Sequence, residues 1–222
     1  MPAGHEPVSV LTPGPVFSEQ DVKATLDSCR LTYIYEPDWT RLRHRVSQIL
    51  SAGRLVAWFQ GDAGSALDAV GGRVIISDPS NRWARENVNR FLRQVPIEAP
   101  IPLVTTADLG QWHDGQVRVT PQNVGVAGAW RNQVIGALDR SGCVQLQEIT
   151  ESGDRQLVEL VRGHSARTGV PALIAVPFSG PSEPVVCSPR EAIRTMFSSP
   201  VDVLVIERFA VAKDHWLLGM HV

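Results

Sequence analysis

Short apolar runs alternate with amphipathic stretches along the chain, so the pattern predicts both strands and helices. Leu42, Val46, Ile49 and Leu50 recur at intervals of three or four, which predicts a helix with one buried face. Other segments are short and rich in apolar residues, a pattern typical of strands covered on both faces. We predict strands over Leu31–Tyr35, Arg54–Phe59, Arg73–Ile76, Pro102–Thr105, Gln133–Leu138, Val144–Ile149, Ala172–Val176 and Val201–Glu207.

Capping residues mark where the predicted helices begin and end. Ser18 with Asp21, and Ser188 with Glu191, place a hydroxyl before a helix and a carboxylate three residues later, which is a reciprocal capping pattern. Glycine after a helix provides a left-handed residue that ends it. We predict helices over 18–29, 38–52, 82–93, 154–168 and 188–197, with Gly53 and Gly169 as two of the stops.

Strands and helices mixed in this way indicate a single domain of the α/β class. We divide the chain into an irregular, Pro- and Gly-rich leader over 1–15, a domain over 16–214 and a tail over 215–222. The stretch Asp108–Trp130 has scattered glycines and little periodicity, and we predict no regular element there.

Composition excludes several classes of protein. The chain has 222 residues, of which 43% are hydrophobic and 20% charged, so wholesale disorder is excluded. We find no apolar run long enough to span a bilayer, no secretory signal, and no Cys/His pair at metal-ligand spacing. A formal net charge of −2 provides no general attraction for nucleic acid. We expect a soluble cytoplasmic protein without a metal site, nucleic-acid partner or membrane partner.

Three blocks of sequence together resemble a known family. They read VAWFQGDAGSALDAVGGRVIISDP over Val56–Pro79, ALDRSGCVQ over Ala137–Gln145, and TGVPALIAVPFSGPSEPVVCSPREAIRTMF over Thr168–Phe197. In order and spacing they resemble the C-terminal domain of the O-carbamoyltransferases of antibiotic and nodulation-factor biosynthesis. The resemblance extends from about Phe17 to Lys213.

The resemblance implies a fold and a chemistry. The implied fold is a YrdC-like open twisted sheet of mixed α+β type, flanked by helices. Family members also carry a large N-terminal domain of the ASKHA (actin-like ATPase) fold, and they use ATP and carbamoyl phosphate to form carbamoyl adenylate, whose carbamoyl group passes to a hydroxyl. This chain is too short to include the large domain, and Met1 with its leader favours a free-standing version over a segment cut from a longer protein.

Several positions that the resemblance assigns to ligands carry other residues here. Asp62 and Asp68 stand where the family has arginines, a change of four charge units that opposes phosphate binding by something on the order of several kcal/mol. Ala137 and Cys143 replace a His and an Arg, and Ala175–Pro177 replaces an Asn-Thr-Ser run. Positions that hold the fold are kept. Loss of the ligand residues while the fold-holding residues are kept is typical of a degenerate or repurposed site.

Candidate site residues remain. Asp62, Asp68 and Glu183 are candidates for acid–base chemistry, with solvated charges or loop orientation as their structural alternatives. Arg73 is the best surviving anion ligand, and a structural pairing with Asp78 or a carbonyl is the alternative. The ligand positions implied by the resemblance are Gly61, Gly71, Arg73, Arg93, Asp139, Gln145, Phe178 and Glu183.

Other reactive residue types are expected to be structural. Cys143 has no His nearby in the sequence, so we predict a buried, inert thiol. His164, on a predicted helix, and His113 are expected to be surface or hydrogen-bonded histidines. Trp58 is expected in the core.

Three functions stay open. The first is a stand-alone carbamoyltransferase C-terminal-like domain with an eroded ATP and carbamoyl-phosphate site and an accessory or repurposed biosynthetic role. The second is an active carbamoyltransferase, or a subunit that forms carbamoyl adenylate, working with a separate ASKHA-fold or biosynthetic partner through Arg73, Arg93 and Glu183. The third is a new enzyme acting on a less anionic small molecule, with Asp62 or Asp68 as its base.

Overall fold

The computed structural model describes residues 15–61, 72–92, 102–106, 113–118, 123–126, 128–149, 154–179 and 183–219. The strands are β1 Ile34–Tyr35, β2 Val56–Phe59, β3 Arg73–Ser77, β4 Pro102–Thr105, β5 His113–Arg118, β6 Asn123–Val126, β7 Cys143–Glu148, β8 Ala172–Pro177, β9 Val203–Ile206 and β10 Phe209–Ala212. The helices are α1 Glu19–Ser28, α2 Trp39–Ser51, α3 Ala84–Leu92, α4 Gly128–Arg131, α5 Arg155–Thr168, α6 Pro189–Phe197 and the 3₁₀ helix η2 His215–Leu218.

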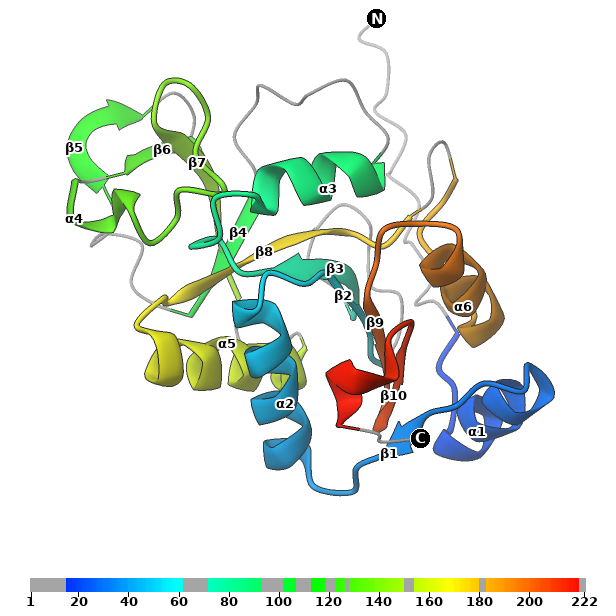
Figure 1. The fold of residues 1–222 in the computed structure, drawn as a ribbon. Helices are drawn as coiled ribbons and strands as arrows, with labels where there is room; N and C mark the ends of the chain where they lie inside the picture. Colours follow the sequence, from blue (N-terminus) through cyan, green and yellow to red (C-terminus); the bar gives the residue numbers. More distant parts are fainter. Residues whose placement is uncertain are drawn as a thin grey trace, which may run out of the picture.

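The strands of the described residues form one mixed sheet in the order β1-β10-β9-β2-β3-β8-β4-β7-β6-β5 (Figure 1). β2 pairs with β9, and β4 with β7, in parallel, while the other neighbours are antiparallel. A mixed, open sheet covered by helices confirms the predicted α/β class. Among the described residues, no helix combines the length and apolar character needed to cross a membrane.

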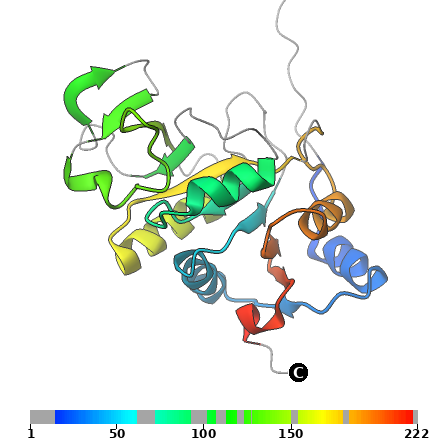
Figure 2. The same cartoon turned by 45° about the horizontal axis from the view of Figure 1, so that its top comes forward.

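Helices cover both faces of the sheet, and alternate strand residues fill two cores (Figures 1 and 2). Ala57 and Phe59 of β2 point to the core shared with α1, α3 and α6, which we call the α3 side. Val56 and Trp58 point to the core shared with α2 and α5, which we call the α5 side. The buried runs in β2 and β9, Val74–Ile76 of β3 and Ala172–Val176 of β8 are apolar because each of these strands is covered on both faces.

The capping residues behave as predicted. Ser18 with Asp21, and Ser188 with Glu191, form complete capping boxes at α1 and α6. Gly169 ends α5 in the left-handed region with φ of +76°. These signals depend only on neighbouring residues, which is why they are readable without a tertiary structure.

The strand predicted over Gln133–Leu138 is wrong, because this segment forms consecutive turns after α4. Val134 N–H donates to Trp130 O at 3.2 Å, and Ala137 N–H donates to Val134 O at 2.8 Å. Val134 and Ala137 are both fully buried. Their spacing of three belongs to a turn and not to a strand, in which alternate residues share a face.

Three strands were not predicted. β5 and β6 lie in the Asp108–Trp130 stretch, where glycines obscure the alternation. β10 follows β9 after the tight turn at Glu207–Arg208, so the predicted Val201–Glu207 strand is the first arm of a hairpin. η2 lies in the segment predicted as a tail, and its Leu218 is buried against the α5-side core.

Candidate functional site

Two strands that are distant in the sequence, β2 and β9, are neighbours in the sheet, and their carboxyl ends lie side by side. Because β2 and β9 run parallel, Gln60 and Glu207, which directly follow them, are neighbours. Gln60 Nε2 donates to Glu207 O at 3.1 Å, and Gly61 N–H donates to Glu207 Oε1 at 3.2 Å. The antiparallel strand β3 begins at this same end of the sheet, where Arg73 pairs with Phe59. We call Phe59, Gln60, Gly61, Arg73 and Glu207 the Arg73 cluster.

The Arg73 guanidinium is turned into the protein. The residue is only 2% exposed, and its Cζ lies 3.4 Å from the centroid of the Phe59 ring. Nη1 donates to Gln60 O, and Nη2 donates to Gly61 O at 2.6 Å and to Pro15 O at 3.4 Å. Both ends of the fork therefore donate to backbone carbonyls. Arg73 therefore has the carbonyl partners that were the structural alternative to an anion ligand.

Glu207 brings a carboxylate to this guanidinium from the β9–β10 turn. Burial raises its pKa above the usual value, as do the charges of Glu19 and Asp154, and the Gly61 hydrogen bond and Arg73 only partly oppose them. Its backbone has φ of 47°, in the left-handed region that favours glycine. A carboxyl group with a raised pKa at a strained turn can exchange a proton closer to neutral pH than an exposed one.

Asp154 adds a second carboxylate from the N-terminus of α5. Burial raises its pKa, although hydrogen bonds from Trp58 and from the Leu157 and Gln156 amides, together with the charge of Arg73, lower it. The Trp58 Nε1–H donates to Asp154 Oδ2 at 2.8 Å. Asp154 is thus both the helix cap and the partner of a core tryptophan.

In the described residues, the Arg73 guanidinium already donates to backbone carbonyls. A phosphate would have to displace the Gln60 and Gly61 carbonyls from Arg73, and it would approach the carboxyl group of Glu207. The buried guanidinium offers no preformed bidentate fork to solvent.

Two predicted ligand positions lie further along the sheet, near the start of β7. Asp139 Oδ1 accepts the Cys143 amide at 2.7 Å, and its own amide donates to Cys143 O at 2.9 Å, so it closes the turn before β7. Gln145 alternates with Val144 and Leu146, which face the α3 side, so it lies on the opposite face from the Arg73 and Phe59 pair. The structure does not bring Gln145 to Arg73.

Phe178 and Glu183 also have structural surroundings. Phe178 is fully buried on the α3 side, with its ring centroid 6.5 Å from that of Phe91. Its amide donates to Arg73 O at 3.1 Å, so a backbone hydrogen bond between two strands places Phe178 next to the Arg73 cluster. Glu183 is exposed, and its Oε2 lies 3.0 Å from Arg194 Nη2 of α6.

Four predicted site residues lie outside the described residues: Asp62, Asp68, Gly71 and Arg93. Their proposed roles stay predictions. Within the part of the chain that is described, His, Cys, Asp and Glu side chains do not gather in threes that could hold a metal ion.

Glu207 and Asp154 were not predicted as site residues. Each follows a feature that is visible in the sequence, since Glu207 ends an apolar strand and Asp154 precedes an amphipathic helix. A polar residue directly after Phe59 and another directly after Ile206 would suggest a common site only if the parallel β2–β9 pairing were known.

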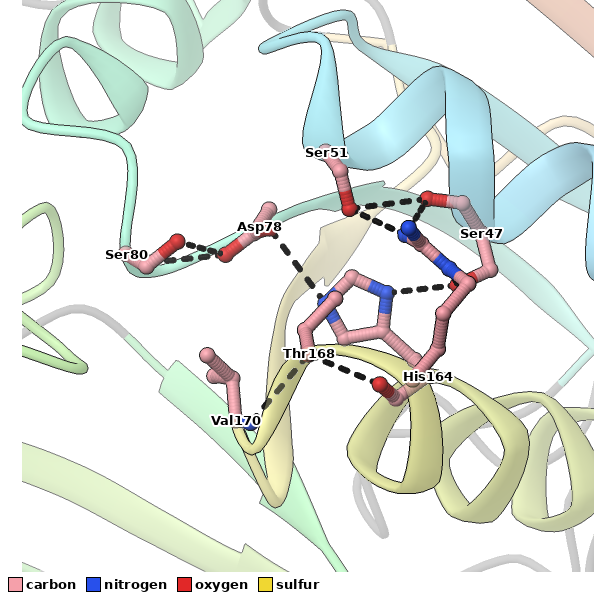
Figure 3. A network of polar contacts seen from close by, with 8 residues as sticks. Ser47, Ser51, Asp78, Ser80, His164, Thr168 and Val170 are labelled. Atoms are coloured by element: carbon pink, nitrogen blue, oxygen red, sulfur yellow. Dashed lines mark hydrogen bonds and ion pairs between the residues drawn. The ribbon is translucent and has the colours of Figure 1, made fainter.

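His164 lies in a buried polar network that resembles a hydrolase triad (Figure 3). Its Nδ1 lies 2.9 Å from Ser47 Oγ, and its Nε2 lies 3.3 Å from Asp78 Oδ2. In serine hydrolases the hydroxyl meets Nε2 and the carboxylate meets Nδ1, the reverse of this order. Ser47 is 2% exposed and its Oγ accepts Arg167 Nε–H at 2.9 Å. A substrate cannot reach this hydroxyl, so His164 is a core histidine whose hydrogen-bond partner is Ser47.

Sequence comparison gives this arrangement a family context. A family model described as Carbamoyltransferase C-terminus matches residues 47–213. The chain is 26% identical to the uncharacterized protein sll1178 of Synechocystis sp. over 90% of its own length and 36% of that protein. It is 25% identical to the nodulation protein NolNO of Sinorhizobium fredii over 76% of its own length and 26% of that protein. The chain therefore spans roughly a quarter to a third of these curated relatives.

Solved structures show the same fold at low identity. A variant of P. abyssi Sua5 has a TM-score of 0.52 and 10% identity, covering 76% of this chain and 49% of that one. Full-length HypF in the phosphate- and nucleotide-bound form has a TM-score of 0.55 and 13% identity, covering 80% of this chain and 22% of that one. These matches confirm the predicted YrdC-like architecture.

Proposed function

Because this chain belongs to the carbamoyltransferase C-terminus family, we propose that it is a member whose arginine site has become structural and whose role in biosynthesis is accessory or repurposed. In this proposal the domain does not itself activate carbamoyl phosphate with ATP. The family fold is retained, and the groups that would bind two polyanions are not.

The observation that supports this proposal is the state of Arg73. Its guanidinium donates to the Gln60 and Gly61 carbonyls and lies against Phe59, with only 2% of the residue exposed. A buried arginine whose donors are bound to carbonyls is a fold-holding group, since phosphate recognition needs a fork that reaches the ligand. In the sequence, Asp62 and Asp68 stand where arginines would add to anion binding.

The experiment is an assay of ATP–pyrophosphate exchange in the presence and absence of carbamoyl phosphate. We expect no exchange above the protein-free background. Thermal unfolding with ATP, AMP and carbamoyl phosphate should show no rise in Tm, because a ligand that binds the native state must stabilise it by mass action. Exchange that depends on carbamoyl phosphate, or a Tm that rises with ligand concentration, would refute the proposal.

A second function is favoured by the length of the relatives. They extend well beyond the region that this chain matches, since it covers 36% of one and 26% of another. In this alternative the chain forms carbamoyl adenylate together with a separate ASKHA-fold subunit that supplies the phosphate ligands. Addition of such a subunit should start the same exchange reaction, and an unchanged background would count against this alternative.

A repurposed enzyme acting on a less anionic small molecule is the third function. Glu207 and Asp154 support it, because burial raises the pKa of both carboxyl groups although the charge of Arg73 opposes the rise. If Asp62 or Asp68 is its base, substitution by Asn should abolish turnover of that substrate and leave the Tm unchanged.

A further inference from the structure

The segment directly before α1 contacts the Arg73 cluster. The carbonyl oxygen of Pro15 accepts a hydrogen bond from Arg73 Nη2 at 3.4 Å. The ring centroid of Phe17 lies 6.3 Å from that of Phe59, the ring on which the Arg73 guanidinium stacks. This segment therefore contacts both members of the Arg73–Phe59 pair. We call residues 15–18 the strap.

The strap is attached firmly on one side and lightly along its length. It leads into α1, whose first turn is fixed by the capping box and whose Val22 and Leu26 are buried in the α3-side core. Within the strap, the side chain of Phe17 packs against the same core, while the other three residues are exposed. The strap is therefore held over the Arg73 cluster mainly by one aromatic side chain.

The hydrogen bonds of Arg73 show that the guanidinium does not need the strap to stay in place. Nη2 donates to Gly61 O at 2.6 Å but to Pro15 O at 3.4 Å, near the length at which a hydrogen bond is weak. Nη1 donates to Gln60 O. These two carbonyls can hold the guanidinium when Pro15 is withdrawn, so the strap can move without dismantling the cluster.

Glu19, the first residue of α1, connects this region to the turn that carries Glu207. Its Oε1 lies 3.4 Å from Arg208 Nε, and its Oε2 accepts the Tyr35 hydroxyl at 2.9 Å. Arg208 directly follows Glu207 between β9 and β10, and the negative charge of Glu19 contributes to the raised pKa of Glu207. The chain around the start of α1 therefore meets the Arg73 cluster at both its arginine and its carboxylate.

We propose that the strap closes the Arg73 cluster, shielding its guanidinium, and that it opens by swinging about the capping box of α1. Phe17 holds the closed position, because its ring is the part of the strap that packs against the core. A ligand that used Arg73 would have to displace the strap first. This closure does not depend on which ligand the cluster binds, or on whether ATP chemistry is lost.

The proposal can be tested by modification of arginines with phenylglyoxal in the full chain, with the rate at each site followed by mass spectrometry. A guanidinium reacts only when the reagent reaches it, so the rate reports local opening. In the wild type we expect Arg73 to react at least about tenfold more slowly than Arg90, whose side chain is 65% exposed. Phe17→Ala should raise the rate at Arg73 by about fivefold or more.

Two controls separate opening of the strap from other effects. Val16→Ala changes the neighbouring strap residue, which is 69% exposed, and should alter the rate at Arg73 by less than about twofold. Arg85 of α3 is the internal reference, since it is partly buried and donates to Ala137 O, away from the strap. Its rate should stay the same in Phe17→Ala.

Two outcomes would overturn the closing role. One is an unchanged rate at Arg73 in Phe17→Ala, and the other is an equal rise at Arg73 and Arg85, which would indicate general loosening. If Phe17→Ala does not fold, Phe17→Leu replaces it, because leucine keeps an apolar side chain but removes the ring beside Phe59. The rate at Arg73 should then rise by about twofold or more, and a wild-type rate would refute the proposal.

The strap and the proposed function fail separately. ATP–pyrophosphate exchange should stay at background in Phe17→Ala, because the Gln60 and Gly61 carbonyls still hold the guanidinium. Exchange activity would contradict the proposed loss of ATP chemistry, whereas the rates of arginine modification decide whether the strap closes the cluster.

Discussion

Arg73 and Phe59 are direct partners across the β2–β3 pair, and the guanidinium carbon of Arg73 lies 3.4 Å from the centre of the Phe59 ring. A cation over an aromatic face is stabilised without any anionic ligand. The pairing keeps the guanidinium buried at the end of these strands, where it donates hydrogen bonds to the Gln60 and Gly61 carbonyls. The arginine therefore contributes to the fold at the position where the family resemblance implies a ligand.

Arg73→Lys should destabilise the protein although it keeps the charge. A lysine ammonium cannot donate in a fork to two carbonyls and cannot stack on Phe59 in the same way. We expect the free energy of unfolding in urea to fall by about 2–4 kcal/mol. Arg90→Lys, at an exposed pair with Glu86, should change it by less than about 0.5 kcal/mol. Equal effects of the two substitutions would contradict the structural role of Arg73.

Asp78→Asn should weaken the acid dependence of stability. Burial alone would raise the Asp78 pKa, but hydrogen bonds from His164 and Ser80 outweigh it and hold that pKa below its usual range. The carboxylate therefore stabilises the native state above the unfolded pKa of about 3.9, and this contribution is lost as the pH falls through the lower folded value. Urea unfolding between pH 7 and pH 3 should show a shallower decline for the variant, and parallel curves would refute this assignment.

Glu207→Gln should shift stability in the opposite sense. Because burial raises the pKa of Glu207, the native state binds a proton more tightly than the unfolded chain. Stability then declines as the pH rises from about 4.3 through the folded pKa, and the variant should lack that decline. The stability of the variant relative to the wild type should thus increase with pH in this window. A constant difference across the window would mean that Glu207 titrates normally.

Gly136→Ala should destabilise the protein because its Cβ has no room beside Asn81 and Ala84. We expect a loss of about 1–3 kcal/mol, as for other overpacked sites. Gly163→Ala is the matched control. Gly163 lies within α5 with open space around the position of a Cβ, so alanine there should add about 0.5–1 kcal/mol through helix propensity. The two substitutions should change the free energy of unfolding in opposite directions, which thermal or urea unfolding measures.

Much of the fold could be predicted from local patterns in the sequence. The capping boxes at Ser18 and Ser188 and the helix stop at Gly169 each involve residues a few positions apart. The buried strands are readable because helices cover both of their faces. The apolar residues of Gln133–Leu138 fit both a strand and a pair of turns. Only the contact of Gly136 with the turn after β3 favours the turns over the predicted strand.

The site was less predictable than the fold. The resemblance selected Arg73 and Gly61, which do lie together, and it also selected Gln145, which lies on the opposite face. The charge of Arg73 acts on Glu207 and Asp154 only because β9 lies beside β2 and α5 begins near Trp58. Such proximity depends on strand order, and strand order has no signature in the residues themselves.

The same strand order has a consequence for synthesis on the ribosome. β2 and β3 can pair soon after they emerge, but their outer neighbours are β9 and β8, and the backbone of Leu55 bonds Asp202, 147 positions later. Both edges of this early hairpin therefore stay open while most of the polypeptide is translated. Nascent chains should consequently depend on holding chaperones until the last strands leave the exit tunnel.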